Sequence, residues 1–320
     1  MRHLFIINPA AKRINGKTQR VREAIAAFFA NYPDIRYDVY ESGWCRDSVT
    51  FIHRYVSETD ETVRVHAIGG KGTLFEVVNS VVGLANAEVA AHPYGKANTF
   101  LKYFGRQNEK LFLSLKSQVF DKAIPMDVIR CGNNYGICYG VAGIEAQARV
   151  RGDNWIEMGI AADISFMLAA VFHILGSKAS QHYHVDIDGV RIEGNFVSVL
   201  VANVPCYGIN MSSAVDAHPD DGVLDVYTFK ETSKLRLMYN MPTYAHGNYR
   251  KLPDLVSHYT AKKIKLSSDE VMCMSLDGEH FYGTSTEYEI MPKAVNFVCP
   301  SEIDLAKLPR IYGKPEEGYR

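Results

Sequence analysis

Residues 63–79 read Val63-Arg-Val-His-Ala-Ile-Gly-Gly-Lys-Gly-Thr-Leu-Phe-Glu-Val-Val-Asn79. In this stretch a short apolar run ends in three glycines within four positions, and a helical pattern begins at once. A strand, a glycine-rich turn and a helix in this order can bind an anion, because glycines let the backbone approach a ligand and unpaired N–H groups at the helix start point toward it. The spacing is neither the GxGxxG of dinucleotide-binding folds nor the GxxxxGK[ST] of P-loops. A tight strand-to-helix connection without a ligand is the alternative interpretation.

The sequence around this stretch alternates strand and helix patterns, which predicts a doubly wound parallel α/β domain over residues 1–125. Ligands of such sheets bind beyond the carboxyl ends of the strands. We therefore expect the loops Asn8–Thr18, Gly69–Thr73 and Pro93–Phe100 to lie at one edge of the sheet. The predicted strands are Leu4–Ile7, Tyr37–Tyr40, Val63–Ile68 and Glu88–His92, and the predicted helices are Gly16–Ala30, Asp47–Ser57 and Thr73–Val82.

The pattern changes near Pro125, after which short β runs dominate. Asp188-Gly189 lies between two of these runs and is typical of a hairpin turn. One helical insert, Trp155–Leu175, interrupts the series. This arrangement predicts an antiparallel β-sandwich domain with a helical insert over residues 126–298. The fold class is therefore α/β plus β, and we expect the C-terminal tail, residues 299–320, to pack back toward the first domain.

Composition indicates which partners and which cellular compartment to expect. The 320 residues are 47% hydrophobic with a net charge of −1, so no bulk attraction to nucleic acid is expected. The six cysteines lack CxxC or zinc spacing, and the first apolar run is too short for a signal peptide, which favours a cytoplasmic protein. Ile164–Leu175 is too short to span a bilayer. It is interpreted as a packed amphipathic helix, with a lipid anchor as the alternative, so a lipid-active chain would meet its substrate peripherally, at the membrane surface.

The glycine turn closely resembles the GGDGT loop of the diacylglycerol kinase and bacterial lipid kinase superfamily, which holds ATP phosphates. Lys71 stands where that family has an acidic residue. Asn8-Pro9 resembles the family's NP loop, and the resemblance implies that Lys12 or Arg13 faces phosphate.

A third segment, His92–Phe100, resembles the family's P-x-G-T-x-N-D-F loop. Lys96 replaces the family's threonine and Thr99 its aspartate, whereas Pro93, Gly95, Asn98 and Phe100 match. The nucleotide-binding residues that the resemblance implies are Asn8, Gly69, Gly70, Lys71, Gly72, Thr73, Gly95, Lys96 and Asn98.

Some of these residues have ordinary structural alternatives. Thr73 with Glu76 three residues later fits a capping box, and Asn98 could cap the next helix instead of contacting adenine or ribose.

Two acidic turns lie in the second half of the chain. Ala217–Asp225 resembles the family's DDG-x-L-D turn, which implies a Mg²⁺ held by the Asp221 side chain and the main-chain carbonyls of His218 and Val223. Such oxygen donors suit a hard cation, although an Asp-Gly turn without metal is equally consistent with the sequence.

The second turn lies in Met274–His280 and resembles the family's DGE triplet. This likeness implies that Glu279 is the catalytic base and that Asp277 orients it or binds metal.

The resemblance, which runs from Asn8 to the DGE triplet, implies a lipid kinase that transfers the γ-phosphate of ATP to diacylglycerol or a related lipid alcohol. ATP would lie in a cleft between the domains, with Mg²⁺ bridging its phosphates. Lys71 and Thr99 support an alternative: a catalytically impaired family member that binds a nucleotide, phospholipid or other anion. A third interpretation is a kinase of a soluble substrate, because NAD kinases share the GGDGT loop. The oligomeric state is open, and a homodimer is one alternative.

Overall fold

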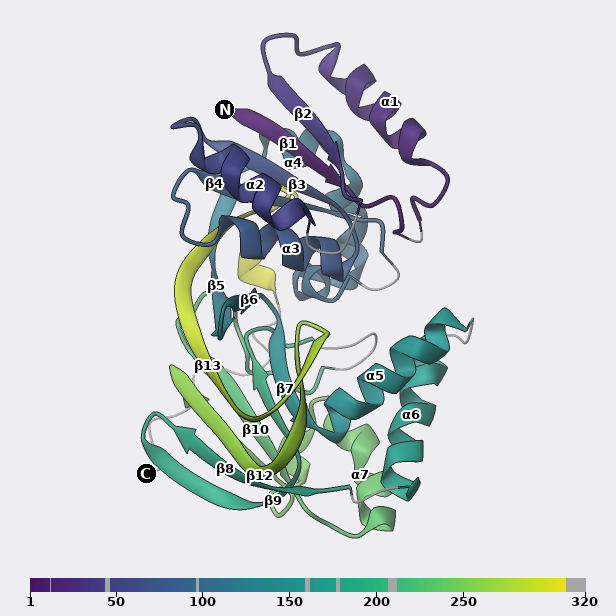
Figure 1. Ribbon diagram of the computed structural model, residues 1–320, viewed down its shortest axis with the longest axis vertical. Coiled ribbons are helices and arrows are strands. Elements are labelled where there is room, and N and C mark those ends of the chain that lie inside the picture. The colour runs from purple at the N-terminus through teal and green to yellow at the C-terminus, as the bar shows by residue number, and fades with distance from the viewer. Residues whose placement is uncertain are drawn as a thin grey trace. The chain divides into compact units, whose positions relative to one another are not determined.

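The computed structural model describes residues 1–11, 13–43, 47–95, 98–158, 162–176, 179–206 and 212–308. These residues form two compact units (Figure 1). The first comprises Met1–Val128 and Pro292–Leu308, and the second comprises Ile129–Met291. The segment that returns to the first unit therefore begins at Pro292, inside a long strand, rather than after residue 298. None of the described helices is both long enough and apolar enough to cross a bilayer.

The first unit is a parallel α/β sheet in which the strands lie in the order β4, β3, β1, β2. The end of β13 (Glu279–Val298) adds a further parallel pairing, with Asn296 opposite Glu88 on β4. The sequence patterns predicted each of these four strands and the three helices between them to within about two residues. The elements are β1 (Arg2–Ile7), α1 (Thr18–Phe29), β2 (Arg36–Glu41), α2 (Asp47–Ser57), β3 (Val63–Gly69), α3 (Lys71–Val81), β4 (Ala87–Pro93), η1 (Phe100–Phe104), η2 (Arg106–Leu113) and α4 (Leu115–Phe120).

This strand order contains one reversal. The chain steps from β1 outward to β2, crosses back to β3 on the other side of β1, and continues to β4. Between β1 and β3 the direction of winding changes, and doubly wound sheets bind their ligands at such a switch point, beyond the carboxyl ends of the strands. The loops that begin at Asn8 and Gly69 follow these two strands.

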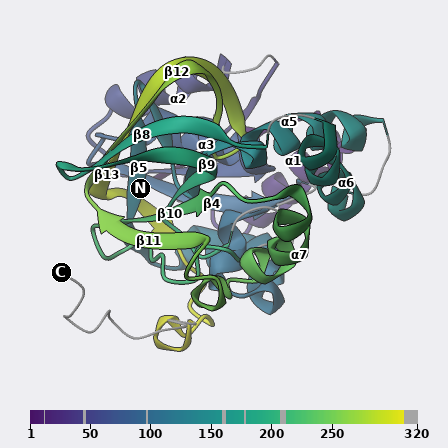
Figure 2. The same cartoon turned by 90° about the horizontal axis from the view of Figure 1, so that it is seen from below.

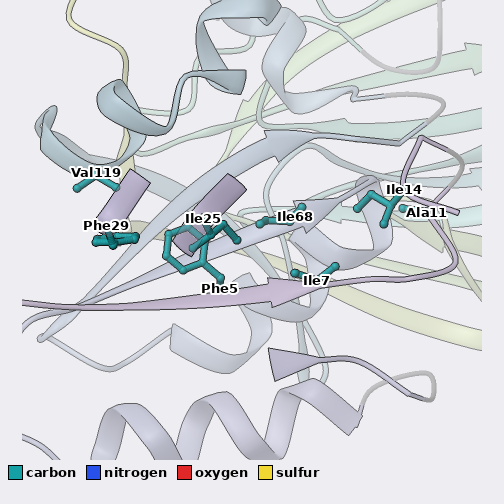
Figure 3. Packing of buried hydrophobic residues seen from close by; sticks show 8 residues of the cluster. All are labelled: Phe5, Ile7, Ala11, Ile14, Ile25, Phe29, Ile68 and Val119. Carbon is teal, nitrogen blue, oxygen red and sulfur yellow. The ribbon is translucent and has the colours of Figure 1, made fainter. Parts of the chain in front are cut away.

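The core of the first unit explains why the helices lie where they do. Right-handed crossovers in this strand order place α1 on one face and α2 and α3 on the other. Ile25 and Phe29 of α1 pack on Phe5, Ile7 and Ile68 from the strands, as Figure 3 shows. On the opposite face α2 and α3 pack against each other (Figure 1). Every residue of β3 is buried, as expected for a central parallel strand covered on both sides.

Three buried histidines form a hydrogen-bonded chain across this core. His3 Nδ1 lies 3.0 Å from His66 Nε2, and His66 Nδ1 lies 3.0 Å from His92 Nε2. Burial lowers the pKa of His3 to about 4 and that of His92 to about 3, and it lowers the pKa of His66 well below its ordinary value. The three imidazoles are therefore neutral at pH 7, and each nitrogen–nitrogen pair shares one proton.

The second unit is antiparallel. Its strands follow the order β11, β10, β9, β7, β12, β13, and β8 pairs with both β9 and β12 (Figure 2). Asp188 and Gly189 both have positive φ and join β8 to β9, so the predicted hairpin turn is confirmed. The elements are β5 (Ala123–Cys131), β6 (Asn134–Gly136), β7 (Tyr139–Gly143), α5 (Ile144–Glu157), α6 (Ala162–Gly176), β8 (Gln181–Ile187), β9 (Val190–Ala202), β10 (Leu224–Lys230), α7 (Lys234–Ala245), η3 (Tyr249–Lys251), β11 (Val256–Ala261) and β12 (Lys263–Leu276), followed by β13; η4 (Leu305–Lys307) belongs to the first unit.

The helical insert is larger than predicted. The sequence indicated one helix at Trp155–Leu175, whereas the structure has two, α5 and α6, which pack against each other. The predicted helix rested on the apolar run that forms α6. α5 was missed because its buried positions include the small residues Ala146 and Ala148 and the charged Glu145, which leave no apolar periodicity.

The histidine chain makes the stability of the first unit depend on pH. Below about pH 6.5 the histidines bind protons in the unfolded state, but the buried imidazoles of the folded state do not. Lowering the pH from 6.5 to about 4 therefore reduces the free energy of unfolding by about 1.4 kcal/mol per pH unit for each histidine. We expect His3→Gln, which keeps a hydrogen-bonding group beside His66, to reduce by about one the number of protons taken up on unfolding at pH 5–6. Urea unfolding followed by circular dichroism at several pH values measures this slope. His53→Gln, at an exposed position of α2, is the matched control, and an equal slope in all three proteins would contradict the assignment.

Candidate functional site

Three loops meet at the carboxyl edge of the parallel sheet. The backbone N–H of Tyr94 donates to the carbonyl of Gly69 (2.9 Å), and the side-chain amide of Asn8 donates to Thr73 Oγ1 (3.2 Å). Arg13 ties the first loop to the third, because its backbone N–H donates to Tyr94 O (3.2 Å) and its Nη1 donates to Pro93 O (3.0 Å). These bonds confirm that the loops predicted from the sequence lie together.

Glycines allow this close assembly. A Cβ atom built on Gly95 would lie closer than 3.0 Å to the Cα of Gly70, and one built on Gly69 would collide with the Thr73 side chain. A side chain at Gly95 would therefore push two loops apart, and one at Gly69 would displace the Thr73 side chain. Gly72 differs, since a Cβ there would meet no atom of the described residues within 4 Å beyond its chain neighbours and the backbone of its own helix. The fold itself does not require a glycine at position 72, and its absent side chain leaves open space at the start of α3.

The helix after the turn begins two residues earlier than predicted. α3 starts at Lys71, and its N-cap is Gly70, which offers no side-chain cap. The capping box of Thr73 and Glu76 is therefore wrong. The Thr73 hydroxyl accepts the bond from Asn8 instead, and the Glu76 carboxylate accepts a hydrogen bond from Ser48 on α2. Both side chains serve contacts between elements, which local sequence spacing cannot reveal.

The start of α3 carries positive charge from two sources. The first turn contains no acidic residue, and Lys71 is its first residue. The aligned peptide dipoles place about half a positive charge at a helix N-terminus, so the ammonium group adds to a potential that already attracts anions. Lys12 and Lys96, which the sequence also placed at this site, lie outside the described residues.

Asn98 is engaged by a side chain that the sequence did not suggest. Its Nδ2 donates to Glu109 Oε1 (2.9 Å) in η2, and the same carboxylate oxygen lies 3.8 Å from Arg13 Nη1. The N-cap of η1 is Thr99, a buried residue, so the alternative in which Asn98 caps this helix is wrong. Glu109 thus links the first and third loops through one carboxylate.

In the second unit, Asp277 fixes the turn that carries Glu279. The Asp277 carboxylate accepts hydrogen bonds from the backbone N–H groups of Ile137 (2.6 Å), Cys138 (2.9 Å) and Tyr139 (2.9 Å). Asp277 and Gly278 both have positive φ, which permits a tight turn between β12 and β13. The structure therefore gives Asp277 a positioning role. Glu279 follows as the half-buried first residue of β13, and within the described ranges its carboxylate has no hydrogen-bond or ion-pair partner.

The acidic turn before β10 offers oxygen donors. Asp221 is exposed, and its Oδ1 accepts a hydrogen bond from the backbone N–H of Val223 (3.1 Å). A neighbouring pair anchors the turn, since Oδ1 of the buried Asp225 lies 2.6 Å from Nε2 of the half-buried His258. Carboxylate and carbonyl oxygens are the donor type that Mg²⁺ prefers, so the predicted set of Asp221, His218 and Val223 fits a hard cation in its chemistry.

Glu145 is a buried acid at the start of α5. Its Oε1 accepts a hydrogen bond from Ser198 Oγ (2.6 Å). Burial raises the pKa of Glu145 to about 7, an effect that the Ser198 hydrogen bond partly opposes.

A parallel α/β unit with a glycine turn at its switch point, followed by an antiparallel β unit, is the architecture of the diacylglycerol kinase fold. Residues 2–131 match the diacylglycerol kinase catalytic domain, and residues 139–299 match the YegS C-terminal NAD kinase beta sandwich-like domain. The chain belongs to the lipid kinase-like family that these two domains define.

Individual relatives agree with this assignment. The chain is 26% identical over 267 residues to the "Probable lipid kinase YegS-like" of Shewanella frigidimarina (strain NCIMB 400), covering 82% of this chain and 84% of that protein. It is also similar in structure to a crystal structure described as a diacylglycerol kinase from Bacillus anthracis str. Sterne. That match has a TM-score of 0.68 and 18% identity, and it covers 95% of this chain and 98% of the other. At this identity the structural match shows the fold alone.

The glycines of the site predict opposite effects for two matched substitutions. Gly95→Ala should lower the melting temperature, because the new Cβ collides with the Gly70 backbone, at a cost of about 1–3 kcal/mol typical of overpacking. Gly72→Ala should leave the melting temperature unchanged or raise it slightly, because the Cβ has room and alanine favours a helix. If the open space receives a phosphate group, Gly72→Ala should nevertheless weaken ATP binding. Thermal unfolding and calorimetric titration with ATP measure the two effects, and unimpaired ATP binding by Gly72→Ala would place the ligand elsewhere.

Proposed function

We propose that the first unit binds ATP with its phosphates on the Gly69–Thr73 turn, and that the protein transfers the γ-phosphate to the hydroxyl of a lipid alcohol of the diacylglycerol type. The observation that carries this proposal is the meeting of three loops, held by glycine contacts, at the switch point between β1 and β3. Membership of the lipid kinase-like family supports the reaction class.

Different groups of the site would bind the phosphates, neutralise their charge and hold the turn in place. Backbone N–H groups at the start of α3 would bind phosphate oxygens, and the Lys71 ammonium would neutralise part of their charge. Asn8 and Thr73, which bond to each other, would hold the turn in its binding conformation. Bound Mg²⁺ would supply further neutralisation of the phosphates, and a structural Mg²⁺ would be held at the Asp221 turn.

Glu279 is the proposed base for the acceptor hydroxyl. Phosphoryl transfer depends mainly on positioning and charge stabilisation, so a base must be held in place before the reaction. The tight Asp277-Gly278 turn provides this, because three backbone N–H groups fix the Asp277 carboxylate two residues before Glu279.

A lipid acceptor is supported by an apolar surface on the second unit. α6 and α7 pack against each other and expose large apolar side chains at helical spacing. Cationic groups border this surface, since the Arg151 guanidinium lies 4.0 Å from the Phe172 ring centroid and Lys234 Nζ donates to Leu175 O (2.9 Å). Apolar side chains beside cations suit the interface of an anionic bilayer. The exposed apolar residues are Leu168, Phe172 and Leu175 on α6, and Leu235 and Tyr239 on α7.

Lys71 supports a second candidate, a family member that binds a polyphosphate but transfers phosphate slowly or not at all. The lysine is the first residue of α3, where the family's motif has an acidic residue. An ammonium group can strengthen the binding of an anion, but it cannot coordinate Mg²⁺.

A transfer assay with radiolabelled ATP and diacylglycerol separates the two candidates. If the protein is a kinase, Glu279→Gln should lower the rate by about 10²–10⁴-fold while ATP binding stays within a few-fold. If the Lys71 ammonium neutralises the phosphates in place of a bound Mg²⁺, the natural protein should bind ATP with little dependence on Mg²⁺. Lys71→Asp combined with Thr99→Asp should then make binding Mg²⁺-dependent and raise the transfer rate. Strong Mg²⁺-dependent turnover by the natural protein that Lys71→Asp abolishes would show the reverse role for this lysine.

The apolar surface predicts binding to anionic vesicles. Phe172→Ser combined with Leu235→Ser should reduce co-sedimentation with phosphatidylglycerol vesicles by tenfold or more, because burying each large apolar side chain is worth about 1.5–3 kcal/mol. Val271→Ser is the matched control, since Val271 is 65% exposed on β12, away from α6 and α7 in the sequence. Equal loss in both variants, or none in either, would remove α6 and α7 from membrane contact.

A further inference from the structure

The hairpin of β8 and β9 gathers three metal-binding side chains on one solvent-accessible face. His182 and His184 are two residues apart on β8, so their side chains point to the same face of the sheet. Glu193 on β9 lies directly opposite His184 in the pairing register. One ligand atom from each of the three lies within 4.8 Å of the others. None of these residues belongs to the site proposed for the nucleotide or the base.

The distances suit a small tetrahedral ion. His184 Nδ1 lies 3.3 Å from Glu193 Oε2. Two ligands at about 2.0–2.1 Å from a tetrahedral zinc ion are roughly 3.4 Å apart. This pair therefore already has the spacing of two ligands on one ion, and a ring nitrogen of His182 lies within 4.8 Å of both as the third ligand.

A neighbouring chain of hydrogen bonds sets the protonation of His182. Asn195 Nδ2 donates to Glu231 Oε2 (2.8 Å), which orients the amide and leaves Asn195 Oδ1 as an acceptor. That oxygen lies 3.3 Å from His182 Nδ1, so Nδ1 carries the proton and donates it. The lone pair of His182 is then on Nε2, free to bind a cation. Metal-binding histidines are commonly oriented by such a bond to the second ring nitrogen.

We propose that His182, His184 and Glu193 form a binding site for a divalent transition-metal cation, with Zn²⁺ as the ion that fits best and water as its fourth ligand. Two imidazoles and one carboxylate suit Zn²⁺, whereas Mg²⁺ and Ca²⁺ require more oxygen donors. The ion would join the first half of β8 to β9, away from their turn, and stabilise the hairpin in the folded protein.

Calorimetric titration of the full chain, free of a polyhistidine tag, with zinc chloride at pH 7.5 tests the site. Magnesium chloride serves as the comparison ion. The variants are His182→Ala, His184→Ala and Asn195→Ala. His53→Ala, on the exposed side of α2, is the matched control for loss of one histidine. Melting temperatures without metal verify that each variant folds.

We expect one equivalent of Zn²⁺ to bind the natural protein and to raise its melting temperature, because a ligand that binds only the folded state stabilises it. Both histidine variants should lose this binding, and the His53→Ala control should keep it. Asn195→Ala should weaken binding by about 10–100-fold, since it removes the bond that orients His182, and the metal-free melting temperature reports separately any effect of losing the Asn195–Glu231 hydrogen bond. Zn²⁺ binding of unchanged affinity in the histidine variants, or no Zn²⁺ binding by the natural protein, would overturn the proposal.

Discussion

The close approach of two backbone segments, at Gly70 and Gly95, is the constraint on which the first unit's site depends. A Cβ on Gly95 would overlap the Gly70 backbone, so the loops after β3 and β4 can share one edge only without side chains there. The carbonyl of Gly69 then receives the N–H of Tyr94, which closes the contact. The reversal of winding between β1 and β3 leaves this edge open to a ligand. Strand order and glycine placement together thus produce the loop edge at which we propose that phosphate binds, and neither would produce it alone.

The second unit differs from the first in that its backbone holds a carboxylate in a fixed position, whereas the first unit leaves space at a loop edge. Asp277 is buried and accepts three backbone N–H groups from residues 137–139. A buried carboxylate is costly unless such donors satisfy it, and once satisfied it is strongly held. Glu279 inherits this fixed position through a turn of two residues with positive φ. If Glu279 is the base, as we propose, this fixed backbone would reduce the entropy lost when the acceptor binds.

Periodicity predicted the elements of the first unit well, and the bounds of α2 agree to the residue with those expected from its pattern. The failures at the three loops share one physical cause, which is contact with residues outside the local segment. Thr73 resembles a helix cap locally but bonds to Asn8, 65 residues away. Asn98 bonds to Glu109, and the pairing of His184 with Glu193 depends on the register of two strands. Local spacing carries no information about which partner tertiary packing supplies.

The remaining question of the site is electrostatic, and it concerns Lys71. A cation in the first turn opposes the helix dipole and costs the isolated helix about 0.3–1 kcal/mol. A bound phosphate about 4 Å away would return roughly 1 kcal/mol in water, or about 4 kcal/mol at an effective dielectric constant near 20. A phosphate bound at this position would therefore more than offset the cost that the helix dipole imposes on the lysine. If phosphate binds there as we propose, Lys71 would stabilise the bound anion in its ground state, whereas acceleration requires charge that follows the phosphoryl group into the transition state. Tight binding and rapid transfer are thus separate properties at this position, and the substitution of lysine for an acid favours the first.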